Sequence, residues 1–256
     1  MIISAFNPKG GVGKTTTAVT LATVLARTKR RVLLVDLEPE MNASISLGVR
    51  PQHSQPSVAE VLLNERRATD VIRRVNGIDN LFLLTGSTEL AHMDARLRHV
   101  RQPERRLADT IRPLASEFDA VILDAPSGYS LMSMSVPIAA DHLVVPIRAD
   151  YLALESLAHF LRWYRQRRTS REANADVIGI LLTMVDRRRQ ATREIVDIIR
   201  VHNKRGVFRT EIPEDPRAAE APSHGVPLVA YAKSRAARAY IAATDELISR
   251  LPRRPR

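Results

Sequence analysis

Cysteine is absent from all 256 residues of the sequence. A disulfide framework, a thiolate metal site and an iron–sulfur cluster are therefore excluded, which fits a reducing compartment such as the cytoplasm. Long apolar runs are also absent, because segments such as 32–35 and 121–123 are far too short to span a bilayer. No basic segment precedes the apolar residues 2–6, so we interpret them as a first strand and not as a signal peptide.

Negative charge is scarce relative to positive charge. The chain has 39 Lys and Arg against 28 Asp and Glu, a formal net charge of +11. Such an excess favours a polyanionic partner, either nucleic acid or an acidic membrane surface. Only five of the basic residues are lysines, and two of them, Lys9 and Lys14, lie in one short loop, which indicates that lysine is required there. Aromatic residues are also few, at 4% of the chain, so we do not expect stacking on single-stranded bases.

Strand-like and helix-like segments alternate along the whole chain. Short apolar segments predict strands at 2–7, 32–36, 81–84, 120–124, 142–146, 177–184 and 207–212. Helical patterns lie at 15–27, 58–63, 69–75, 103–117, 130–140, 152–167, 192–203 and 234–251, with Ser57 and Thr69 as expected N-caps. This alternation predicts an α/β fold, a mostly parallel twisted sheet with helices on both faces. We expect a single domain over residues 1–256, with no N-terminal helix-turn-helix domain.

A glycine-rich segment joins the first predicted strand to the first predicted helix. It matches the end of the phosphate-loop pattern G-x-x-x-x-G-K-[ST], with Pro8 at the position of the first glycine. It reads Lys9, Gly10, Gly11, Val12, Gly13, Lys14, Thr15 and Thr16. The glycines let backbone N–H groups turn toward phosphate oxygens, and the helix N-terminus adds a favourable dipole. We expect Lys14 to reach the β- and γ-phosphates, Thr15 to ligate Mg²⁺ and Thr16 to contact the α-phosphate, which predicts a P-loop NTPase that binds ATP with Mg²⁺.

Two carboxylates end predicted strands, Asp36 after 32–35 and Asp124 after 120–123. P-loop enzymes place the acid that holds Mg²⁺ at such a strand end. A lone Asp at a strand end is usually a turn former, but two of them in a chain with a phosphate loop indicate an active site. We therefore predict that Asp36 and Asp124 complete the metal site with Thr15.

Lys9 before the double glycine resembles the deviant phosphate loop of the ParA/MinD family of ATPases. Further motifs resemble the ParA/Soj partition ATPases over nearly the whole chain. They read VDLEPEMNAS at 35–44, LTMVD at 182–186 and EAPSHGVP at 220–227, followed by Ser234, Arg235 and Tyr240. The resemblance implies an ATP-dependent, face-to-face homodimer in which Lys9 contacts the partner's nucleotide. It also implicates Pro213 and Asp215 in holding adenine.

The resemblance further implies that the dimer binds double-stranded DNA without sequence preference. A ParB-like or cargo-adaptor protein would stimulate hydrolysis and so release the DNA, in a cytoplasmic, nucleoid-associated protein. By position, Arg188 and Arg217 are the implied DNA contacts, with Arg189, Lys233 and Arg235 as neighbours. The arginines at 162–171 are more typical of a solvated helix face.

The chain departs from the family pattern D-x-D-P-Q-G-N at three positions. Glu38 replaces the second Asp, which positions the attacking water, while Glu40 stands for Gln and Met41 for Gly. The longer Glu38 side chain moves its carboxylate by about 1 Å, and a misplacement of that size can cost ~10²-fold in rate. We therefore expect slow turnover, with Lys9, Lys14 and Glu38 as the catalytic residues.

Two alternative functions stay open at the level of sequence. A MinD-like, membrane-associated positioning ATPase needs a C-terminal amphipathic helix, but Pro252 and Pro255 interrupt the tail, so we expect no stable membrane binding. A nucleotide-gated DNA-binding scaffold with little hydrolysis is favoured by Glu38. The absence of cysteine excludes an electron-transfer ATPase, and the cargo is not specified by the sequence.

Overall fold

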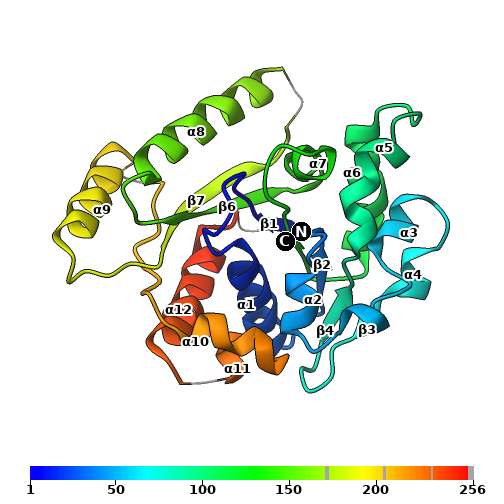
Figure 1. Ribbon diagram of the computed structural model, residues 1–256, viewed down its shortest axis with the longest axis horizontal. Coiled ribbons are helices and arrows are strands. Elements are labelled where there is room, and N and C mark those ends of the chain that lie inside the picture. The colour runs from blue at the N-terminus through cyan, green and yellow to red at the C-terminus, as the bar shows by residue number, and fades with distance from the viewer. Residues whose placement is uncertain (171–172, 204–205, 232, 253–256) are drawn as a thin grey trace.

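A seven-stranded sheet forms the centre of the molecule (Figure 1). The computed structural model describes residues 1–170, 173–203, 206–231 and 233–252. The strands run in the order β3-β4-β2-β5-β1-β6-β7. Their bounds are β1 Ile2–Ala5, β2 Val32–Asp36, β3 Arg73–Arg74, β4 Leu81–Leu84, β5 Ala120–Asp124, β6 His142–Arg148 and β7 Asp176–Thr183. All neighbours pair in parallel except β3, which is antiparallel to β4, so the prediction of a mostly parallel sheet is confirmed.

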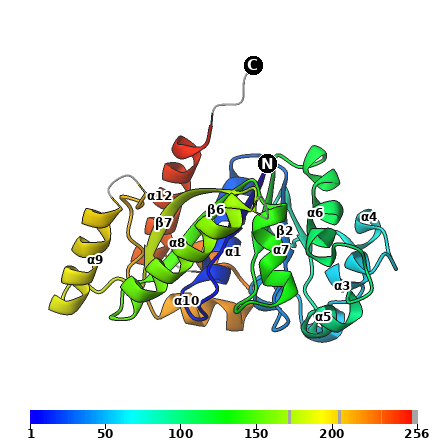
Figure 2. The same ribbon diagram turned by 90° about the horizontal axis from the view of Figure 1, so that it is seen from above.

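Helices cover both faces of this sheet (Figures 1 and 2). The α-helices are α1 Lys14–Arg27, α2 Asn42–Ser46, α3 Val58–Leu62, α4 Ala68–Val71, α5 Met93–Arg96, α6 Arg106–Ile111, α7 Leu131–Ala139, α8 Ala153–Thr169, α9 Gln190–His202, α10 Arg217–Glu220, α11 Leu228–Tyr231 and α12 Arg235–Arg250. Short 3₁₀ turns lie at Pro51–His53, Thr88–His92, Pro103–Arg105, Pro113–Ser116 and Ala221–His224. In the part of the chain that the structure describes, no helix is long and apolar enough to cross a membrane.

Alternation along the strands divides the core into two layers. Leu33 and Val35 of β2 pack on one face with α3, α6, α7 and α8, whereas Val32 and Leu34 pack on the other face with α1 and α12. Successive side chains of a strand point to opposite faces, so every second residue belongs to the same layer. Asp36 continues the series of Val32 and Leu34 and therefore points to the α1 side, where the phosphate loop lies.

The bounds of α3, α4 and α6 differ in part from the helices predicted from the sequence. The Ser57 N-cap of α3 is confirmed, because its hydroxyl accepts the Ala59 N–H at 3.2 Å and the Glu60 carboxylate accepts the Ser57 N–H at 2.9 Å. The Thr69 N-cap is wrong, since α4 already begins at Ala68. The helix expected at 103–117 is divided, because α6 ends at Ile111 and Pro113, which has no N–H to donate, starts a separate 3₁₀ turn.

The strand predicted at 207–212 is also wrong. This segment meets β7 only irregularly, at an isolated bridge of Val207 with Ile180 and through the Phe208 and Ile212 N–H groups, which donate to carbonyls of β7 at 2.9 Å. Between them, the backbone N–H groups of Arg209 and Thr210 donate to the buried carboxylate of Glu246 on α12, at 2.8 and 3.0 Å. A side chain from a distant helix therefore takes the two N–H groups in the middle of the segment, and no continuous strand forms beside β7.

Candidate nucleotide-binding site

The segment between β1 and α1 turns around the N-terminus of α1. Gly11 and Gly13 have φ of 70° and 86°, left-handed conformations that suit glycine. The loop is held from outside at two points: the Thr183 hydroxyl donates to the Val12 carbonyl at 2.9 Å, and the Gly128 N–H donates to the Pro8 carbonyl at 2.8 Å. The loop is therefore fixed by β7 and by the loop after β5 before any ligand binds.

Lys14, the first residue of α1, is buried inside this loop. Its Nζ donates to the Ser127 Oγ at 2.7 Å and to the Lys9 carbonyl at 3.3 Å. Burial lowers the pKa of Lys14, while the charges of Glu38 and Asp124 act in the opposite direction. The ammonium group is thus held at the centre of the loop, beside two acids, where a phosphate group would be its natural additional partner.

Asp36 and Asp124 are register partners at the ends of β2 and β5, and both are fully buried. Asp36 accepts three hydrogen bonds, from the Ser44 N–H at 2.8 Å, the Ser44 hydroxyl at 2.7 Å and the Glu38 N–H at 3.2 Å. No donor of the described residues makes a hydrogen bond within 3.5 Å to either carboxylate oxygen of Asp124, and the Thr15 hydroxyl nearby favours its charged form only weakly against the effect of burial. Burial raises the pKa of Asp36 to about 6, and burial together with the charge of Asp36 raises the pKa of Asp124 well above its usual range.

This pair of acids fits a magnesium ion. A buried carboxylate without a partner is costly, and a divalent cation would offset both the lost hydration and the repulsion from its neighbour. The described residues contain no cluster of three or more His, Asp or Glu that could hold a metal alone. Mg²⁺ usually keeps several waters and is bound by one or two protein oxygens together with phosphates, which agrees with this arrangement.

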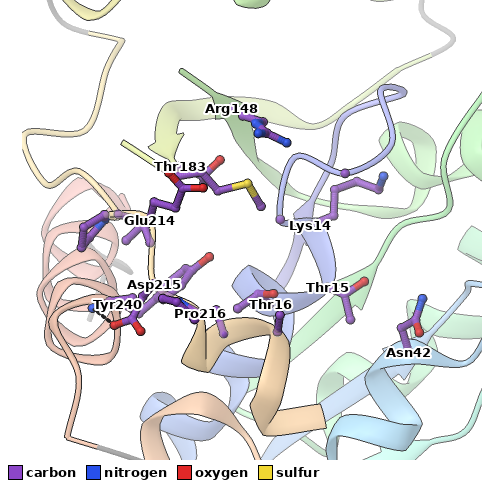
Figure 3. Close-up of a pocket in the computed structure, with 18 of the residues that line it drawn as sticks. Lys14, Thr15, Thr16, Asn42, Arg148, Thr183, Glu214, Asp215, Pro216 and Tyr240 are labelled. Carbon is purple, nitrogen blue, oxygen red and sulfur yellow. Dashed lines mark hydrogen bonds between the residues drawn. The ribbon is translucent and has the colours of Figure 1, made fainter. Parts of the chain in front are cut away.

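A pocket of about 600 Å³ extends from the phosphate loop toward α12 (Figure 3). Its phosphate end is lined by Lys14, Thr15 and Thr16, and its other end by the segment 212–216 and Tyr240. Pro213 and Asp215, which the resemblance placed at adenine, both line it. Pockets of this size hold ligands as large as a nucleotide.

Glu38 and Lys9 take partners within the chain. Glu38 Oε1 accepts the Ser127 N–H at 3.1 Å and the Ser127 hydroxyl at 3.2 Å. The Lys9 Nζ lies 3.4 Å from the Asp150 carboxylate, in the loop after β6. Ser127 therefore stands between Glu38 and Lys14, and Lys9 is directed toward an acid that sequence reasoning did not single out.

Three other residues of the site were missed from the sequence. Ser44 holds Asp36, and the loop after β4 packs so closely on Asp36 that a Cβ at Gly86 would lie 2.9 Å from its Cγ. The Tyr240 hydroxyl lies 3.3 Å from the Thr17 hydroxyl and joins α12 to α1. The sequence contained a signal for the first and last of these, since both lie within the motifs that carry the family resemblance. Met41, where the family has Gly, adopts φ of 59° and shows why glycine suits that position.

The basic residues that the resemblance implicated in DNA binding lie on three segments that contact one another. Asp215 accepts the N–H of Arg217 at 3.1 Å and of Ala236, beside Arg235, at 3.4 Å. Arg189 links the loop after β7 to this group through Glu214, at 3.7 Å. We call the set of these basic residues the basic rim, and its members are Arg188, Arg189, Arg217, Lys233 and Arg235.

Most of the basic rim is paired with acids. Arg188 makes two hydrogen bonds to Asp186, at 2.8 and 3.0 Å, although its side chain is 88% exposed. Arg217 lies 4.0 Å from Asp215. Lys233 and Arg235 are exposed and have no ion pair to another described residue. The five residues thus lie on neighbouring segments at one side of the pocket. Ion pairs with acids reduce the net positive charge at Arg188, Arg189 and Arg217.

Comparisons with known proteins show the family of this chain. Residues 1–177 match the family model described as an AAA domain. The chromosome partitioning protein ParA of Myxococcus xanthus is 35% identical over 257 residues, which cover 100% of this chain and 90% of that protein. The chromosome-partitioning ATPase Soj of Thermus thermophilus is 36% identical over 254 residues, with 97% and 96% covered.

Solved structures give the same result. The cobyrinic acid a,c-diamide synthase of Mycobacterium smegmatis, with bound ADP and magnesium, has a TM-score of 0.82 at 28% identity and covers 96% of this chain and 93% of its own. The cell division ATPase MinD of Pyrococcus furiosus has a TM-score of 0.77 at 27% identity, with 97% and 98% covered. The fold, the phosphate loop and the similarity over nearly the full length agree, and the chain belongs to the ParA/Soj family of P-loop ATPases.

Proposed function

We propose that this chain is a partition or positioning ATPase that binds MgATP in the pocket between the phosphate loop and α12. The observation that carries the proposal is the buried, unpartnered carboxylate of Asp124 beside Lys14 and Thr15. In this proposal Lys14 contacts the β- and γ-phosphates, Thr15 and Asp124 hold the metal, and Asp36 supports it. Magnesium, when bound, neutralises charge on the phosphates. Pro213 and Asp215 lie beside the adenine base of the nucleotide.

The proposal includes a nucleotide-dependent homodimer in which Lys9 reaches the partner's nucleotide. Its support is the surface around Lys9. Asp150, the acid that holds Lys9, is followed by Tyr151 and Leu152, whose exposed fractions are 87% and 53%. Adjacent large apolar residues in open solvent are typical of a surface that is covered in another state. Pairing two copies over this surface would bury them and bring each Lys9 to the other subunit.

The basic rim supports binding of double-stranded DNA through its phosphates, without base recognition. In this proposal the ATP-bound dimer holds DNA, and slow hydrolysis stimulated by a ParB-like or cargo-adaptor protein releases it. The relatives named as chromosome partitioning proteins support this role. The protein would therefore act in the cytoplasm, in association with the nucleoid.

One experiment tests the three parts together. The wild type, Lys9→Ala and Lys14→Ala are compared by light scattering and by co-sedimentation with DNA or with anionic liposomes, with and without MgATP. We expect the wild type to form a dimer and bind DNA only with MgATP. Lys14→Ala should lose nucleotide binding, whereas Lys9→Ala should bind nucleotide and stay monomeric. Sedimentation with liposomes instead of DNA would replace this proposal by the membrane-associated alternative.

The second candidate, a nucleotide-gated DNA scaffold with little hydrolysis, is favoured by the state of Glu38. Both hydrogen bonds of its Oε1 go to Ser127, so the carboxylate is engaged within the chain and not directed freely into the pocket. If Glu38 still orients water, Glu38→Ala should trap the ATP-bound dimer, and Glu38→Asp should raise the stimulated hydrolysis rate by roughly tenfold or more. Equal rates in all three proteins would favour the scaffold.

A further inference from the structure

Arg148 is a second cation, beside Lys14, among the residues that line the nucleotide pocket. It is the last residue of β6 and the register partner of Thr183 on β7. Because Val144 of the same strand packs in the α1 layer and side chains alternate, Arg148 points to the α1 side of the sheet as well. It lines the pocket with Gly11 and Lys14, and Figure 3 shows it over the phosphate loop, between Thr183 and Lys14.

The guanidinium of Arg148 is poorly satisfied within the chain. Its Nε lies 3.6 Å from the Asp150 carboxylate, too far for a good hydrogen bond, and no other ion pair reaches it from the described residues. The same carboxylate also holds Lys9, at 3.4 Å. One acid thus serves two cations, and most of the five N–H donors of Arg148 have no protein acceptor in the described part of the chain.

Stability alone does not explain this arrangement. The side chains of Arg148 and Asp150 are 47% and 36% exposed, and ion pairs between groups so exposed contribute little to folding. A planar guanidinium with open donors at the end of a parallel strand is instead well suited to phosphate, which it can bind through two hydrogen bonds at once. Enzymes that transfer phosphoryl groups commonly place such an arginine against the phosphates, from the same or a neighbouring subunit.

We propose that Arg148 is a substrate-binding residue that contacts the outer phosphates of the nucleotide held in its own subunit, on the side of the phosphate loop opposite Asp124. This inference rests on the proposed function of the pocket. It assigns two different tasks to the two cations beside Asp150. Lys9 serves the partner's nucleotide, and Arg148 serves the nucleotide of its own subunit. Asp150 competes with the phosphates for Arg148.

The test measures affinity for MgADP and for a non-hydrolysable MgATP analogue by calorimetry in the Lys9→Ala background, which is expected to be monomeric. Arg148→Gln should weaken binding of the ATP analogue by roughly 10- to 100-fold, the range for loss of a charged hydrogen-bonded contact. Arg148→Lys should recover part of the loss. Arg162→Gln, which removes an exposed arginine of α8 outside the pocket, should change neither affinity. Thermal unfolding without nucleotide should be the same in all four proteins.

Three outcomes would overturn the inference. Affinity for the ATP analogue within twofold of the Lys9→Ala reference in Arg148→Gln would show that the guanidinium does not touch the nucleotide. An effect that occurs only in a background with Lys9 intact would assign Arg148 to the partner's nucleotide. If the wild type fails to bind either nucleotide, the proposed function falls as well, whereas binding that Lys14→Ala abolishes and Arg148→Gln leaves intact removes only the role of Arg148.

Discussion

The two ends of the nucleotide pocket are built in different ways. The phosphate end comes from one continuous loop and from two neighbouring strand ends, and its charged groups Lys14, Asp36 and Asp124 are buried. The base end and the basic rim come from the loop after β7, the segment 212–217 and the start of α12, joined mainly through Asp215. Their basic groups lie at the surface and are mostly paired with acids.

This difference sets the expected size of each substitution. A buried charge interacts through a low effective dielectric and has few alternative partners, so its removal is costly. Exposed ion pairs contribute little each, and they act on DNA only through their sum. Substitutions at the phosphate end should therefore abolish one step completely, whereas substitutions at the rim should reduce affinity gradually.

The largest effect is expected at Lys14. Lys14→Ala should reduce MgATP affinity by roughly 100-fold or more, because it removes the only buried ammonium among the described residues and its charged hydrogen bonds to phosphate. Calorimetric titration measures this change. Lys29→Ala, in the exposed turn after α1, is the matched control and should bind as the wild type does. A loss of MgATP affinity of less than threefold in Lys14→Ala would contradict the expected difference between the buried phosphate end and the exposed rim.

Asp124→Asn should separate stability from binding. Without magnesium, the substitution removes a buried, unpartnered carboxylate beside Asp36, so the melting temperature should rise by about 2–4 °C, the shift that follows from about 1 kcal/mol in a chain of this size. In the Asp124→Asn variant, the addition of magnesium should no longer strengthen ATP binding. Asp119→Asn, at an exposed residue just before β5, is the control. A lower melting temperature together with intact magnesium dependence would show that Asp124 is structural.

The double variant Arg188→Gln, Arg217→Gln tests the basic rim. DNA affinity should fall, and the slope of log affinity against log salt concentration should decrease by roughly 2, from about 0.9 for each lost phosphate contact. MgATP affinity should stay within twofold. The pair Arg162→Gln, Arg165→Gln on α8 removes the same charge from another surface. If the two double variants have the same salt slope, the rim is not the DNA site.

The smallest effect is a pH dependence at Asp186. Hydrogen bonds from Arg188 lower the pKa of Asp186 to about 2, below the value of about 3.9 for an unfolded chain. The pair therefore adds stability above about pH 4, and this contribution is lost as the pH falls toward 2. The difference in urea midpoint between the wild type and Arg188→Gln should shrink over that range. For Arg235→Gln, which has no described acidic partner, the difference should not change with pH.

The phosphate end was predictable from the sequence, and most of the base end was not. Glycine spacing, the identity of Lys14 and the carboxylates that end two apolar strands are local patterns, and the structure places all of them together. The segment 207–212 looked like a strand because it is short and apolar. The N–H groups of Arg209 and Thr210 donate instead to Glu246, a residue more than thirty positions away that the pattern could not connect with them.

By itself, the sequence determined the parallel sheet, the phosphate loop and the family, because these depend on apolar periodicity, glycine conformation and the spacing of a few residues. The tertiary structure alone decided which partner each charge takes. It placed Asp150 against Lys9, more than a hundred residues away along the chain, and it left Asp124 with no close hydrogen-bond partner among the described residues. The reason is that the energy of a charge depends on its burial and on the distance to other charges. Both quantities are set only when remote segments pack together.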